Sequence, residues 1–289
     1  MTEAVERSAL TLAEEVAREI LGLVKGERAV IGHKTDALDV VTAADIAIEA
    51  HARARISASF PSHAILGEEE GLDEQGREWT WVLDPIDGTF NYATGLPGAA
   101  SAIALMRGNE TRVGVIADFS GRTVLSCLKG GGIACDGRPP AGREAELGRA
   151  RLLIDPGHQS PDAAVFRVIQ ALAELAPVVP RMIGSAAVSL AAVAVAGGCF
   201  VGAGLELWDA AAGMLLAEEA GRTVQWWKYT GDTSYHVLAG DAELVRALEP
   251  LMPDYIRAWL RGQVFHVPHQ WNMEDLTPVL LGPSPTILL

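Results

Sequence analysis

The segment Trp81-Val82-Leu83-Asp84-Pro85-Ile86-Asp87-Gly88-Thr89 constrains the fold of this chain more than any other. Its apolar start is typical of a buried strand, and Pro85 and Gly88 then favour a turn. A strand that ends in this way can direct two carboxylates, Asp84 and Asp87, at one point. The segment therefore predicts an acidic site at the end of a strand.

Two further acidic groups lie at the ends of other expected elements. Glu68 follows a short apolar strand at Ala64 to Leu66, and Asp209 opens a helix after Trp208. If these carboxylates converge, each like-charged pair about 4 Å apart costs roughly 4 kcal/mol at an effective dielectric near 20, so cations must neutralise them. Oxygen ligands without histidine or thiolate favour a hard ion. Magnesium fits, because it keeps water and substrate oxygens among its ligands.

Hydrophobic periodicity around these strands indicates a mixed α+β first part. Helical spacing of Leu12, Val16, Ile20 and Leu23 predicts a helix from about Thr2 to Val24. A second helix should begin near Thr42. Turn signals at Gly108-Asn109 and Ser120-Gly121 separate three strand-like runs, which predicts an antiparallel meander. The runs are Ala100 to Met106, Arg112 to Ala117 and Arg122 to Leu128.

The pattern changes after the Pro139-Pro140 pair, where strands and helices begin to alternate. We predict an N-terminal α+β lobe over residues 1–138, an α/β lobe over residues 139–262 and an irregular arm over residues 263–289. The second lobe should contain strands at Ala150 to Ile154, near Val178 and at Cys199 to Ala203, and helices from Ser160-Pro161, Ser185 and Asp209.

Charge and cysteine content narrow the class of protein. A net charge of -14 repels a nucleic-acid backbone, so we expect no duplex DNA or RNA as a partner. Glutamates near the N-terminus argue against a secretory signal peptide, and no uninterrupted apolar run is long enough to cross a bilayer, so we expect no membrane partner. Three cysteines without a close-spaced pair fit a reducing compartment, and we expect a cytoplasmic protein.

Three motifs together resemble the signature of the inositol monophosphatase family. They are Gly67-Glu68-Glu69, Asp84-Pro85-Ile86-Asp87-Gly88-Thr89 and Trp208-Asp209-Ala210-Ala211-Ala212-Gly213. The resemblance extends from Lys34 to Gly184-Ser185-Ala186-Ala187 and beyond, and leaves only the arm after Gly262 unmatched. It implies a layered αβαβα sandwich of two packed lobes. It also implies a magnesium-dependent, lithium-sensitive phosphatase that pairs as a homodimer.

The resemblance further implies a set of metal ligands. Glu68, Asp84 and the main-chain carbonyl of Ile86 would hold a first magnesium ion. Asp84, Asp87 and Asp209 would hold a second, and a third, looser ion would lie near Glu68. Two such ions clamp the attacking and leaving oxygens of a displacement at phosphorus.

Contacts to water and phosphate follow from the same resemblance. Thr89 and Asp45 would orient the attacking water and draw off its proton, so we count both, with Glu68, among the catalytic residues. From its position alone, Asp45 is interpreted as a capping residue three positions after Thr42. The turn at Gly88 and Thr89 opens a helix whose free backbone N–H groups can bind phosphate, and Lys34 would neutralise phosphate or anchor its own loop.

Selectivity is where this sequence departs from the family pattern. Inositol-selective members resembling this chain carry a glutamate seven positions before the helix aspartate, where this chain has Gly202. Loss of a buried acceptor loosens or redirects substrate choice, and Glu206 could take its place. Arg181 could contact substrate or a partner subunit, or form a structural salt bridge. The expected substrate contacts are Asp87, Gly184, Ser185, Ala186, Gly202, Glu206 and Arg181.

These features predict a phosphomonoesterase that hydrolyses an inositol phosphate, or a related polyol or sugar phosphate, with metal-activated water. Histidinol phosphate and nucleoside monophosphates are alternative substrates within the same family. A catalytically silent metal-binding scaffold is the alternative of another class. The complete acidic set, together with Thr89, argues against the scaffold.

Overall fold

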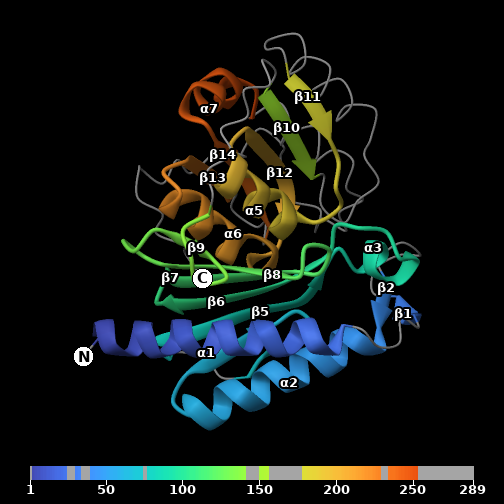
Figure 1. Ribbon diagram of the computed structural model, residues 1–289, viewed down its shortest axis with the longest axis vertical. Helices are drawn as coiled ribbons and strands as arrows, with labels where there is room; N and C mark the ends of the chain where they lie inside the picture. Colours follow the sequence, from blue (N-terminus) through green and yellow to red (C-terminus); the bar gives the residue numbers. More distant parts are fainter. Residues whose placement is uncertain are drawn as a thin grey trace, which may run out of the picture.

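The computed structural model describes residues 2–24, 30–33, 40–73, 77–140, 150–155, 178–228 and 234–252. They form five layers in which helices and sheets alternate (Figure 1). The layered α/β fold expected from the sequence is confirmed. The outer helices are α1 (Thr2–Leu23) and α2 (Ala43–Ser59), the central helices are α5 (Ala186–Ala196) and α6 (Leu207–Glu219), and α7 (Ala242–Leu248) packs on the far sheet.

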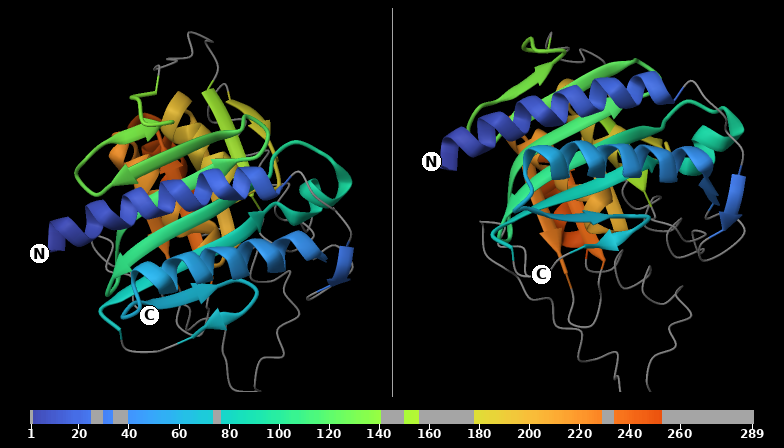
Figure 2. Two further views of the ribbon diagram at one scale, coloured as in Figure 1. Left: turned by 60° about the horizontal axis from the view of Figure 1, so that its bottom comes forward. Right: turned by 90° about the horizontal axis from the view of Figure 1, so that it is seen from below.

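A seven-stranded sheet separates the outer helices from the central pair. Figure 2 shows α1 and α2 lying side by side across one face of this sheet. Its strands pair in the order β4-β3-β5-β6-β7-β8-β9, and only the β3–β5 pair is parallel. Strands β6 to β8 form the predicted antiparallel meander. The bounds are β3 (Ala64–Gly67), β4 (Gly71–Leu72), β5 (Trp79–Asp87), β6 (Ala100–Arg107), β7 (Glu110–Asp118), β8 (Thr123–Leu128) and β9 (Ile133–Cys135).

A five-stranded sheet covers the other side of α5 and α6. Its order is β11-β10-β12-β14-β13, in which the first three strands are parallel and the rest antiparallel. The bounds are β10 (Ala150–Asp155), β11 (Val178–Arg181), β12 (Cys199–Leu205), β13 (Thr223–Trp227) and β14 (Tyr235–Gly240). Short elements complete the described chain: the hairpin β1 (Val30–His33) and β2 (Val40–Thr42), helix α3 (Thr89–Thr94) and a 3-10 turn at Glu249–Leu251.

Local sequence signals explain where the helices begin and which face they bury. Helix α1 buries Leu12, Val16 and Ile20, three of the four apolar residues whose spacing predicts it, whereas the fourth, Leu23, is exposed at the end of the helix. Helix α5 begins after Ser185, whose hydroxyl accepts a hydrogen bond from a backbone N–H of the first turn. No described helix combines the length and apolar character needed to cross a bilayer.

Helix α6 corrects one sequence prediction, because it begins at Leu207 and not at Asp209. Glu206 is the N-cap, and its N–H donates to the Asp209 carboxylate at 2.8 Å. Asp209 is therefore the third helical residue, in a capping-box position. The helix expected at Ser160-Pro161 and the arm over residues 263–289 lie outside the described residues, and the lobe boundaries stay predictions.

Candidate active site

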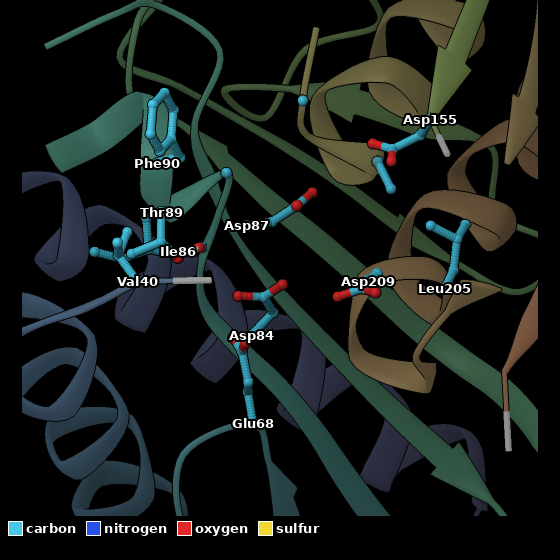
Figure 3. Close-up of a pocket in the computed structure, with 13 residues that line it drawn as sticks. Val40, Glu68, Asp84, Ile86, Asp87, Thr89, Phe90, Asp155, Leu205 and Asp209 are labelled. Carbon is cyan, nitrogen blue, oxygen red and sulfur yellow. Dashed lines mark hydrogen bonds between the residues drawn. The ribbon is translucent and has the colours of Figure 1, made fainter. Parts of the chain in front are cut away.

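A β-bulge in β5 turns two carboxylates toward the same pocket. In a regular strand, residues three apart face opposite sides of the sheet. The pairing of β5 with β6 shifts between Asp84, opposite Ala102, and Asp87, opposite Ala100, so β5 has one extra residue there. Asp84 and Asp87 consequently share a face, and both line one pocket (Figure 3).

Two more carboxylates reach this pocket from neighbouring elements. Strands β3 and β5 run parallel with Gly67 opposite Leu83, so Glu68 follows directly beside Asp84. Asp209 enters from the first turn of α6, on the opposite wall (Figure 3). The four side chains come from three segments that are distant in sequence, and all four line the same pocket.

Burial and mutual repulsion disfavour negative charge on these groups. Burial raises the pKa of Asp84 well above its ordinary value, and the charges of Glu68 and Asp87 raise it further. The pKa of Asp209 is raised in the same way, by burial and then by Glu68. Burial also raises the pKa of Asp87 well above its usual range, with the charge of Asp209 adding to it. Cations would relieve this repulsion.

The side chains present fit a hard metal ion. Asp84 is 1% exposed, and its Oδ1 has no hydrogen-bond partner among the described residues. A buried acceptor left in this state costs about 1–3 kcal/mol, which a bound cation would recover. Within the described ranges no three acidic, histidine or cysteine side chains are already arranged as a metal-ligand set. Magnesium is compatible with so open an arrangement, since it keeps several waters and substrate oxygens as ligands.

Asp87 is held in place by the start of α5. Its Oδ2 accepts hydrogen bonds from the Ser185 hydroxyl at 2.8 Å and from the Ala187 N–H at 2.5 Å. Both bonds lower the pKa of Asp87, although burial outweighs them. The loop before α5 therefore fixes the direction of a carboxylate that belongs to the other sheet.

Asp45 joins the start of α2 to the start of α3. Its Oδ2 accepts hydrogen bonds from the Thr42 N–H at 2.7 Å and from the Thr42 hydroxyl at 2.5 Å. Its Oδ1 lies 3.4 Å from the Thr89 hydroxyl, which also lies 2.8 Å from the Ile86 carbonyl oxygen. Asp45 thus caps α2 and also reaches Thr89, so the two interpretations drawn from the sequence are compatible.

Close backbone packing requires a glycine at position 88, which lines the pocket. It has a φ of 87°, and a Cβ there would lie 2.7 Å from the Gly98 carbonyl oxygen and 3.0 Å from that of Gly184. Both contacts are with backbone, which cannot easily move aside. Asn91 holds this packing together, because its side-chain amide donates to the carbonyls of Gly98 and Ile183.

The structure places the predicted substrate contacts unevenly. Gly184 and Ala186 line the pocket, as do Ile86, Gly88 and Thr89. Ser185 does not line the pocket, but its hydroxyl donates a hydrogen bond to Asp87, which does. Three further predicted residues do not line it: Gly202, Glu206 and Arg181. Arg181 is exposed and donates to the adjacent Pro180 carbonyl, and Lys34 lies outside the described residues.

Sequence reasoning missed one carboxylate that lines the site and one that supports the loop beside it. Asp155 ends β10 and lines the pocket, and its place at the carboxyl end of a parallel strand was the available signal. Glu49 is 1% exposed in α2, and it accepts hydrogen bonds from the backbone N–H groups of Glu69 and Glu70. Nothing in the local pattern of a polar helix face distinguishes this glutamate from its neighbours.

Comparison with known proteins shows what the chain is similar to. The inositol monophosphatase family matches residues 1–251. The chain is 32% identical to the protein named Nus factor SuhB from Pseudomonas aeruginosa, over 78% of this chain and 88% of that protein. It is 34% identical to inositol-1-monophosphatase from Mycobacterium bovis, over 74% of this chain and 82% of that protein. A solved structure of inositol monophosphatase from Anabaena superposes with a TM-score of 0.69 at 30% identity, over 84% of this chain and 96% of that one.

Proposed function

The chain belongs to the inositol monophosphatase family, whose members are metal-dependent phosphoric monoester hydrolases, and we propose that it hydrolyses phosphate monoesters of small polyols or sugars with magnesium as the cofactor. The contact between Asp45 and Thr89 carries the proposal, because it lies beside the pocket where the four carboxylates of the sequence motifs converge. Inositol phosphate is the first candidate, since two relatives, from Mycobacterium bovis and Anabaena, are named for it.

Five groups would hold the ions: the side chains of Glu68, Asp84, Asp87 and Asp209 and the carbonyl of Ile86. The buried Oδ1 of Asp84, which has no hydrogen-bond partner in the described part of the chain, supports this assignment. Bound magnesium would polarise the phosphoryl oxygens and acidify a bound water. We propose two ions, with a third near Glu68, in line with the sequence prediction.

The protein's own part in the reaction is to orient water. A hydroxyl has one proton, so Thr89 donates to either the Ile86 carbonyl or Asp45 at any moment. When it donates to Asp45, its oxygen accepts a hydrogen bond from a water molecule in the pocket, which directs that water at phosphorus. As the water attacks, its proton passes to the Thr89 oxygen and the Thr89 proton passes to Asp45. Positioning of this kind accounts for much of the catalysis in phosphoryl transfer.

A substrate panel tests the proposal directly. Phosphate release would be measured with magnesium for inositol phosphates, sugar phosphates, histidinol phosphate and nucleoside monophosphates. We expect turnover of at least one polyol or sugar phosphate, inhibition by lithium and loss of turnover in Asp87→Asn with the fold retained. If no substrate of the panel released phosphate although calorimetry showed magnesium binding, the metal-binding scaffold would be favoured instead.

Pairing into a homodimer is also part of the proposal and rests on the family resemblance. Size-exclusion chromatography with light scattering measures it. A mass of about one chain, 30.6 kDa, would contradict it.

A further inference from the structure

One acidic residue of the pocket has no part in the proposed chemistry. Asp155 is the last residue of β10, is 8% exposed and lines the pocket together with Leu205. Its charge contributes to raising the pKa values of both Asp87 and Asp209, so it lies within electrostatic reach of both. A carboxylate here repels the phosphate of a substrate, and it must therefore act on another part of the molecule.

Asp155 lies where the leaving group is expected. Figure 3 shows Thr89 and Asp155 on opposite sides of the pocket, with the side chains of Asp84, Asp87 and Asp209 between them. In an in-line displacement the attacking and leaving oxygens occupy opposite sides of phosphorus. Because the proposed function directs the water from Thr89, the leaving group extends toward Asp155.

The neighbouring strand supplies no competing polar group. Strands β10 and β12 are parallel, with Asp155 paired to Gly202. A Cβ at Gly202 would lie 2.7 Å from Phe200 Cζ and 2.8 Å from Leu205 Cδ1, so apolar side chains already fill that space. Glu206, the substitute considered from the sequence, does not line the pocket.

We propose that Asp155 is a specificity-determining residue that accepts a hydrogen bond from a donor on the leaving group, either a hydroxyl or an ammonium group. The inference rests on the proposed function and deepens it. A carboxylate offers only acceptor oxygens, which match both kinds of donor. The described residues that line the pocket include no lysine, arginine or histidine, so a second anionic group would meet only the like charge of Asp155. The favoured class is thus monophosphates of polyols or amino alcohols, in preference to bisphosphates.

The test compares substrates with and without a donor in the leaving group. We would measure kcat/KM of the wild type, Asp155→Ala and Asp155→Asn with inositol 1-phosphate, histidinol phosphate and phenyl phosphate, whose leaving group has no additional donor. Asp118→Asn is the matched control, because Asp118 also ends a strand but does not line the pocket. Circular dichroism and the magnesium concentration for half-maximal activity would be measured for every variant.

We expect Asp155→Ala to lower kcat/KM at least tenfold for the preferred donor-bearing substrate and less than twofold for phenyl phosphate. Asp155→Asn keeps an acceptor oxygen but loses the charge. Activity retained in this variant identifies a hydroxyl donor, and activity lost identifies an ammonium donor. Equal losses on all three substrates, a shifted magnesium requirement or unchanged kinetics would overturn the inference. If the wild type releases phosphate and Asp155→Ala does so equally well, this inference is wrong and the proposed function stands. If the wild type is inactive, the proposed function is wrong as well.

Discussion

The carboxylate of Glu49 lies directly against Gly67, the residue before Glu68. A Cβ added at Gly67 would lie 2.2 Å from Glu49 Oε1 and 2.4 Å from its carboxyl carbon. Glu49 in turn accepts hydrogen bonds from the N–H groups of Glu69 at 2.8 Å and Glu70 at 3.0 Å, and Arg53 Nε lies 2.9 Å from it. The acidic loop that presents Glu68 is therefore held by a buried carboxylate beneath it.

Replacement of Glu49 by alanine should loosen this loop. The change leaves two backbone N–H groups without their acceptor and removes one partner of Arg53, which keeps its bonds to the Ile65 and Gly71 carbonyls. Breaking a buried pair costs about 3 kcal/mol. We expect a loss of that size in the free energy of unfolding, measured by urea denaturation, and a raised magnesium requirement. Glu3→Ala, which removes an exposed pair with Arg7, is the control and should change stability by less than about 1 kcal/mol. Equal effects of the two variants would rule out a positioning role for Glu49.

Gly67→Ala should act through the same carboxylate. The new methyl group would force Glu49 away from its N–H donors, so the two single changes should be less than additive in the double variant. Unfolding free energies of all four proteins measure this coupling. Gly22→Ala in α1 is the control, because nothing lies within 4 Å of its Cβ, and it should be neutral or stabilise by up to about 1 kcal/mol. Additive losses would contradict the predicted displacement of Glu49.

Elements with a local signal could be predicted from the sequence, and contacts that depend on tertiary packing could not. The spacing of Leu12, Val16 and Ile20 predicted α1, and Ser185 predicted the start of α5. The sequence predicted that a turn after Asp84 directs Asp84 and Asp87 at one point. The convergence is confirmed, but β5 continues to Asp87 and a bulge in its pairing with β6, which depends on tertiary packing, produces it. Glu49 is buried only because a distant glycine leaves room for it.

The residues of the candidate site also divide into those that a sequence motif predicted and those that only the folded structure brings there. The motifs predicted which acidic residues would gather, and Glu68, Asp84, Asp87 and Asp209 do line one pocket, although their metal-binding roles stay predictions. Asp155 was missed because its strand carries no motif. Its place in the site follows from the register of β10 beside β12, a property of the folded sheet.

Thr89→Ala should abolish most of the turnover without unfolding the protein. It removes the only hydroxyl that lies between the Ile86 carbonyl and Asp45 among the described contacts. Loss of a positioned proton acceptor costs roughly 10²–10⁴-fold in kcat. Thr89→Ser keeps the hydroxyl and should retain most of the activity, which makes it the matched control. Comparable activity of the alanine and serine variants would refute the role of this hydroxyl.

Magnesium should stabilise the protein more at pH 8 than at pH 5.5. Without metal, the pKa values of Asp84, Asp87 and Asp209 are raised in the folded state. Their contribution to stability is therefore greatest below the pKa that these groups have in the unfolded chain, and it is lost as pH rises toward their folded-state pKa. Magnesium binds the deprotonated carboxylates and therefore competes with protons. Thermal unfolding with magnesium or with chelator, at both pH values, measures the difference. Equal stabilisation at the two values would contradict carboxylate binding.

Introducing a glutamate at position 202 should not make the protein selective for inositol phosphates. The family resemblance implies a glutamate at the position of Gly202 in inositol-selective members, but Phe200 and Leu205 occupy the space its side chain would need. Gly202→Glu must displace Leu205, which lines the pocket, and overpacking of this kind costs about 1–3 kcal/mol. We expect lower stability and a higher KM for every substrate of the panel. Gly202→Glu combined with Leu205→Ala removes the contact with Leu205 but keeps the one with Phe200, so comparison with the single variant shows how much of the loss Leu205 causes. If the single variant gained preference for inositol 1-phosphate without a loss of stability, the space beside Asp155 would have to be open, contrary to the packing of β12.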